Sequence, residues 1–214
     1  MDRREALSRV ALIFGGTIIG AEAFLSGCKT TPAKEGLFSA DDIAFLDEVG
    51  DTILPTTASS PGAKAAQIGD FMKTIVTDCY TEDDQKTFTD GIGKLNDASK
   101  KKFSKGFMDL SAEQKHDLLV DLDGEAKQRA REIGEKQNKL TEEETHQMTL
   151  AKNTGTYKRD PQDEPHYFGM IKQLTLWGYF SSKPGATQAL RYIAVPGKYE
   201  GCIPYKKGDK AWAT

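Results

Sequence analysis

The sequence predicts an all-α fold, an irregular small helical domain that ends in a segment rich in aromatic, glycine and proline residues. Apolar residues recur at helical spacing in several stretches, and helix-capping pairs precede these stretches. No stretch has the sustained alternation of apolar and polar residues that is typical of a half-buried strand. The chain has 214 residues, 38% hydrophobic and 29% charged, which suits one domain with a modest core. Its net charge of −3 gives no electrostatic reason to expect nucleic-acid binding.

Residues 1–27 have the anatomy of a signal peptide: a charged start, a short apolar run and a small-residue processing site. The apolar run contains glycines and is shorter than the roughly 20 apolar residues that a spanning helix needs. Arg3 and Arg4, with Leu7 after them, resemble the twin-arginine export signal. Because Ala6 stands where that signal commonly has phenylalanine, ordinary Sec export remains the alternative.

The signal ends in a stretch that resembles the bacterial lipobox, Leu25-Ser26-Gly27-Cys28. In a lipobox the cysteine thiol receives a diacylglyceryl group, and cleavage then makes that cysteine the first residue of the mature chain. We therefore expect residues 28–37 to be a lipidated tether, and the alternative is a buried cysteine that ends a helix. The acyl chains would hold the protein at a bacterial membrane, facing the periplasm, without a spanning helix. The choice between the inner and the outer membrane stays open.

Two cysteines remain after Cys28, namely Cys79 and Cys202. In an oxidising compartment an isolated pair is a candidate for a disulfide bond. The alternatives are that both thiols are free, or that one bonds to a partner chain. Helical periodicity places Cys79 on a buried stripe, where it would act as a small core side chain.

The domain proper is expected over residues 38–214, and its first helices have clear starts and stops. Ser39 and Asp42 form a capping pair before an apolar series that Pro55 ends. Residues 56–62 are rich in Thr, Ser, Pro and Gly and predict a loop. The clearest amphipathic helix follows, with apolar side chains on one face at Ile68, Phe71, Met72, Ile75, Val76 and Cys79.

Further helix starts are predicted at Thr81 with Asp84 and at Ser111 with Gln114. Gly91 and Gly93 weaken the first of these two helices in its middle. The stretch 124–162 is predicted to be a charged helical excursion or a mobile insertion, with a loop at its end. A last helix is expected from residue 163, with a shared face of Tyr167, Met170, Ile171, Leu174 and Trp177.

Signatures of catalysis are nearly absent from the sequence. His116, His146 and His166 have no Cys or His partner at metal-ligand spacing, so we interpret them as surface or helix-start histidines. The chain has no haem-attachment motif, no glycine-rich nucleotide loop and no nucleophile elbow. We therefore expect no catalytic, cofactor-binding or metal-binding residue in this chain.

The last forty residues concentrate aromatic side chains, glycines and prolines. Such a segment either covers a core as irregular structure or presents aromatic anchors to another protein. The candidate partner contacts are Trp177, Tyr179, Phe180, Tyr192, Tyr199 and Trp212. The alternative function is a stand-alone lipoprotein binding module, for example one that holds a carbohydrate through Trp177, Tyr179 and Trp212.

Short motifs, taken in their order, make the chain similar to the gluconate 2-dehydrogenase subunit 3 family. They follow the export signal as Phe38-Ser39-Ala40-Asp41, Thr52-Ile53-Leu54-Pro55-Thr56, Gly178-Tyr179-Phe180-Ser181 and the stretch 196–202. The resemblance covers nearly all of the mature chain, and only the stretch 124–162 has no counterpart that we can place.

The resemblance implies a small subunit without its own cofactor that pairs with a large FAD-dependent sugar or polyol dehydrogenase of the glucose-methanol-choline type. A cytochrome c subunit is a further partner in such complexes. In this family the twin-arginine signal of the small subunit is thought to export the folded flavoprotein as well. Cys28 is a departure, because many relatives have an ordinary cleaved signal, and it puts shared export of the partner in doubt.

Overall fold

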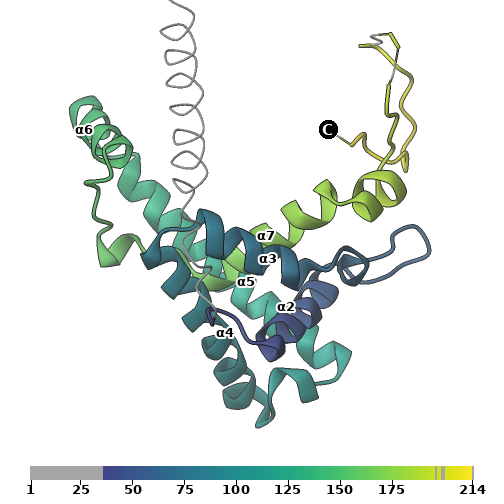
Figure 1. Ribbon diagram of the computed structural model, residues 1–214, viewed down its shortest axis with the longest axis horizontal. Coiled ribbons are helices and arrows are strands. Elements are labelled where there is room, and N and C mark those ends of the chain that lie inside the picture. The colour runs from purple at the N-terminus through teal and green to yellow at the C-terminus, as the bar shows by residue number, and fades with distance from the viewer. Residues whose placement is uncertain (1–35, 196, 199–200, 214) are drawn as a thin grey trace, which may run out of the picture. The chain divides into compact units, whose positions relative to one another are not determined.

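The computed structural model describes residues 36–195, 197–198 and 201–213, and residues 38–214 cluster as one unit. Within the described residues the regular structure is helical, with two isolated β-bridges and no strand, so the predicted all-α class is confirmed (Figure 1). The α-helices are α2 (Ala40–Ile53), α3 (Ile68–Cys79), α4 (Glu82–Phe103), α5 (Ala112–Gln137), α6 (Glu142–Asn153) and α7 (Tyr167–Ser181). Short 3-10 turns are η1 (Ala63–Ala66), η2 (Phe107–Asp109) and η3 (Pro161–Asp163), and η4 (Gly185–Ala189) is a π-helical turn.

The predicted helix starts agree with the observed N-caps. Ser39 caps α2 and Ser111 caps α5, each in a reciprocal capping box with the residue three places later. Thr81 accepts a hydrogen bond from the Asp84 amide at the start of α4. A further capping box, Thr141 with Glu144, begins α6 and was not among the predicted starts.

Helix α7 lies at the centre of the fold and packs against α2, α3, α4 and α5. Figure 1 shows α3 crossing α7, which is drawn in light green. The core side chains that are least exposed come from these helices and from η2: Tyr179, Phe88, Phe107, Phe168, Leu46, Ile68, Met72, Leu95, Ile171, Leu174, Val49 and Val76. Burial of this apolar surface is the main stabilising term of such a domain.

A glycine in α4 is a packing point between helices. A Cβ atom on Gly91 would lie 2.5 Å from the Cβ of Tyr167, at the start of α7. The sequence predicts that Gly91 weakens this helix. In the structure α4 continues through Gly91 to Phe103. The missing side chain lets α7 approach α4 closely, so the glycine serves helix packing.

The amphipathic patterns of α3 and α7 are correct except at their last positions. Ile68, Met72 and Val76 are fully buried in α3, whereas Cys79 at its C-terminal end is exposed, so its predicted place on the buried stripe is wrong. In α7 the predicted buried face is present, but Trp177 is 54% exposed and the helix begins at Tyr167 rather than at residue 163. Cys79 is the last residue of α3, whereas Trp177 lies on α7 beside the buried Gly178 and keeps one contact, with Phe71 of α3.

The charged stretch 124–162 is helical for most of its length. Helix α5 runs through Gly124 to Gln137, and α6 follows without a single buried residue. Ion pairs join α5 to the segment around η3: Lys136 pairs with Asp160 and Asp163 at 3.1 and 2.8 Å.

Candidate functional site

The predicted aromatic contact residues separate into exposed and buried ones. Trp177, Phe180, Tyr192 and Trp212 are each between 40 and 55% exposed. Tyr179 is 1% exposed and belongs to the core, so its assignment as a partner contact is wrong. Tyr199 lies outside the described residues.

The buried Tyr179 has a structural role that explains its position in α7. Its hydroxyl shares a 2.6 Å hydrogen bond with the Ser60 hydroxyl, in the loop that follows α2. A buried hydroxyl needs such a partner, because leaving it unpaired is costly. Tyr179 therefore ties the end of α7 to the α2–α3 loop. Its burial also means that it is not available to the alternative carbohydrate site, which would use Trp177, Tyr179 and Trp212.

Trp177 is exposed but held in place. Its ring meets the edge of Phe71 from α3 at a centroid distance of 5.4 Å and an interplanar angle of 85°. Gly178 permits this contact between helices, since a Cβ atom there would lie 2.5 Å from the Phe71 ring. The indole is thus a fixed apolar surface at the C-terminal half of α7.

After η4 the described residues 192–195, 197–198 and 201–210 form no helix or strand, and we call them the C-terminal loop. The residues that flank the loop pair with each other: the Arg191 amide donates to Ala211, and the Ala213 amide donates to Arg191, both at 2.8 Å. The Arg191 guanidinium also lies 4.7 Å from the centroid of the Trp212 ring, a cation–π contact. The two ends of the loop are therefore held together at its base.

Lys210 fixes this base to the helical part of the chain. Its ammonium group donates to the Gln188 carbonyl in η4 and, at 3.2 Å, to the Ser59 carbonyl in the α2–α3 loop. The same α2–α3 loop holds the Tyr179 hydroxyl through Ser60. The base of the C-terminal loop and the end of α7 consequently share one polar junction.

Beyond its base, the C-terminal loop exposes large apolar side chains. The exposed fraction is 81% for Val195 and 73% for Tyr205. The other large apolar side chains that the loop exposes are Tyr192, Ile193 and Ile203. The aromatic content of the sequence predicts Tyr192 as a contact residue but not the others. The signal that could have identified the others is a set of apolar residues that lie between glycines and prolines and lack helical or strand periodicity.

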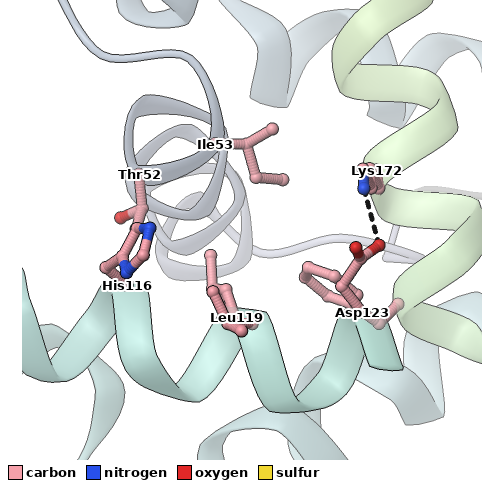
Figure 2. Close-up of a pocket in the computed structure, with 8 residues that line it drawn as sticks. Thr52, Ile53, His116, Leu119, Asp123 and Lys172 are labelled. Atoms are coloured by element: carbon pink, nitrogen blue, oxygen red, sulfur yellow. Dashed lines mark hydrogen bonds and ion pairs between the residues drawn. The ribbon is translucent and has the colours of Figure 1, made fainter. Parts of the chain in front are cut away.

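A separate hollow of about 220 Å³ opens between α2, α5 and α7 (Figure 2). Figure 2 shows Thr52 and His116 on one side of it and the Lys172–Asp123 ion pair on the other. Both Asp123 oxygens are engaged, at 2.7 Å by Lys127 and at 2.6 Å by Lys172. These two ammonium groups lower the pKa of Asp123 below its ordinary value. An ionised carboxylate held in this way is a poor proton acceptor, so the geometry favours a structural role for the pair.

The histidines lie where the sequence predicts for helix-start and surface residues. His166 caps α7, and its Nδ1 accepts a hydrogen bond of 3.3 Å from the Phe168 amide. Burial lowers the pKa of His166, and nearby Glu125 opposes this shift in part. The lowered pKa favours the neutral ring, which can accept the hydrogen bond of this cap. His116 is exposed on the rim of the hollow. Among the described residues, no group of three or more His, Cys, Asp or Glu side chains could hold a metal ion.

Cys79 and Cys202 are both exposed free thiols. Of the alternatives that the sequence leaves open, the structure describes the two free thiols. The signal and lipobox residues Arg3, Arg4, Leu7, Leu25, Ser26, Gly27 and Cys28 lie outside the described residues. In the part of the chain that the structure describes, every helix is too short or too polar to cross a membrane.

The comparisons with known proteins identify a family. The model of a family described as gluconate 2-dehydrogenase subunit 3 matches residues 40–197, from the start of α2 into the C-terminal loop. Nothing among the curated proteins and nothing among the solved structures matches the chain.

Proposed function

The chain belongs to the gluconate 2-dehydrogenase subunit 3 family, and from this premise we propose that it is the non-catalytic small subunit of an FAD-dependent sugar or polyol dehydrogenase. The observation that carries the proposal is the family match, which covers every helix of the residues that the structure describes. In this proposal FAD and hydride transfer belong to a large subunit of the glucose-methanol-choline type. A cytochrome c subunit would receive the electrons, and the present chain would stabilise the large subunit.

We further propose that this chain supplies the export signal and the membrane anchor of the complex. Arg3 and Arg4 would direct twin-arginine export, which transports folded proteins, so a flavoprotein already folded around FAD could cross with this chain. The lipid on Cys28 would then hold the complex at the periplasmic face of a membrane. Several acyl chains on one residue give stable anchoring, since each buried methylene contributes about 0.8 kcal/mol.

Isolation of the tagged full-length chain from the membranes of its own cells tests the subunit assignment. The proposal predicts a flavoprotein at about one FAD per chain, measured by fluorescence after the flavin is released. Recovery of the chain without any flavoprotein would contradict it.

Two variants then separate the export and anchor roles. In the variant with Arg3→Lys and Arg4→Lys, the dehydrogenase activity should be found in the cytoplasm, because export fails. In Cys28→Ser, the activity should be found outside the cytoplasm but not bound to the membrane. Activity that stays outside in the double lysine variant would rule out shared export, and activity that stays on the membrane in Cys28→Ser would rule out the lipid anchor.

A further inference from the structure

The C-terminal loop combines a fixed base with an exposed tip. Its base is fixed by the Arg191 backbone pairing, by the Arg191–Trp212 stack and by the hydrogen bonds of Lys210. Structureless loops longer than about 12–15 residues are uncommon in domains and are usually functional or disordered. The contacts at the base argue for function, because they hold the two ends of the loop at one place on the body.

The exposed apolar side chains of the loop are of the kinds found in protein-binding segments. Tyr205, Tyr192, Ile193 and Val195 are all more than half exposed, the highest concentration of exposed large apolar side chains among the described residues. Trp177, which is also 54% exposed, lies on α7 against Phe71 of α3 and is a separate exposed aromatic side chain. Tyrosine and tryptophan are the residues most enriched in interface hot spots, since they supply large rigid contact areas at low entropic cost.

Charge distinguishes this part of the chain from the rest. From residue 192 to residue 210 the sequence has four basic and two acidic residues, a net charge of +2. The whole chain has a net charge of −3, so the remainder carries −5. A basic, apolar segment on an acidic body is suited to a partner whose docking face is acidic around an apolar centre, because opposite charges speed association and exclude other partners.

We propose that the C-terminal loop is the surface that binds the catalytic subunit of the dehydrogenase. This inference rests on the proposed function and names the part of the chain that makes the contact. The partner has an acidic face with apolar pockets for Tyr205, Val195 and Ile193. A lipid surface is disfavoured as the occupant, since glycines and prolines punctuate the loop and its described residues form no amphipathic helix that could lie in a membrane interface.

The test uses the full-length tagged chain, produced together with its dehydrogenase, and measures the FAD recovered per chain. The loop variant carries Ile193→Ser, Val195→Ser and Tyr205→Ser, and a second variant carries Lys206→Glu and Lys207→Glu. The matched control carries Met108→Ser and Leu150→Ser, which are exposed apolar side chains outside the loop. We expect at least a tenfold loss of FAD in the loop variant and less than twofold in the control. The glutamate variant should lose FAD more at low salt than at high salt.

Other outcomes would overturn the proposal. If the wild-type chain recovers FAD and the loop variant recovers as much, the proposed surface is wrong while the proposed function stands. If the wild-type chain recovers none, the proposed function itself fails. Vesicles of anionic phospholipid test the lipid alternative with Cys28→Ser chains. Binding that requires the loop, together with unchanged FAD recovery, would assign the loop to the membrane and contradict the proposal.

Discussion

The helical body and the C-terminal loop use the same kinds of side chain in opposite ways. In the body, Phe88, Phe107 and Phe168 are at most 1% exposed, and they pack between helices that specify their own ends by capping. In the loop, Val195 and Tyr205 are more than 70% exposed, and the ordering contacts are confined to the base. The body can thus be stable by itself, whereas the apolar tip of the loop gains its burial only from another molecule.

The largest expected effect separates the two regions by stability. Leu46 is fully buried in α2, so Leu46→Ala should lower the free energy of unfolding by about 3–4 kcal/mol through lost burial and a cavity. Val195→Ala removes a side chain that is 81% exposed and should change it by less than about 0.5 kcal/mol. Urea denaturation of the purified chains measures both. A large loss in Val195→Ala would mean that the loop is part of the core.

A smaller effect tests the junction between the two regions. Tyr179→Phe removes the hydroxyl that meets Ser60 and leaves that part-buried serine without this partner. We expect a loss of about 1–1.5 kcal/mol in the free energy of unfolding. Tyr192→Phe is the matched control, since the Tyr192 ring is 55% exposed, and it should have no measurable effect. Equal stability of the two variants would contradict the role assigned to the Tyr179 hydroxyl.

The smallest effect concerns pH and the body alone. Burial lowers the pKa of His166 below its ordinary 6.5, so the unfolded chain takes up this proton at a higher pH than the folded chain. As the pH falls from 7 through 6.5, the free energy of unfolding should therefore fall, and this contribution should level off below the folded pKa.

His166→Asn keeps a residue that can cap α7 and removes the titration. Its unfolding free energy should depend less on pH in this window, by at most about 1.4 kcal/mol per pH unit. Urea denaturation between pH 5 and 7.5 measures the difference between the two chains. If the unfolding free energies of both chains depend on pH in the same way, folding does not lower the pKa of His166.

Most of the helical body could be predicted because its signals are local. The pairs Ser39 with Asp42 and Ser111 with Gln114 fix helix starts through hydrogen bonds within four residues, and all of them are observed. The misses depend on neighbours distant in the sequence. Gly91 reads as a weak point until Tyr167 is seen packed against it, and Cys79 continues an apolar stripe past the end of the surface that covers it.

The candidate surface was only partly predictable for the same reason. Aromatic composition identified Trp177, Tyr192 and Trp212, which are exposed, but it also included Tyr179, whose partner Ser60 lies 119 residues away. Ile193, Val195 and Tyr205 were missed, because an apolar residue without periodicity does not indicate whether it is buried or exposed. The contacts of Lys210 with residues 59 and 188 equally cannot be foreseen from local sequence.

The central claim is that the helical body is stable by itself and that the C-terminal loop binds the partner. Hydrogen–deuterium exchange, measured on the chain with and without its dehydrogenase, tests this claim most directly. The account predicts that amides of residues 192–210 exchange within seconds in the free chain and become at least tenfold slower in the complex. Amides in the middle of α2, α4 and α7 should be slow in both. Loop amides that exchange equally fast in the complex, with new protection confined to α5 and α6, would contradict it.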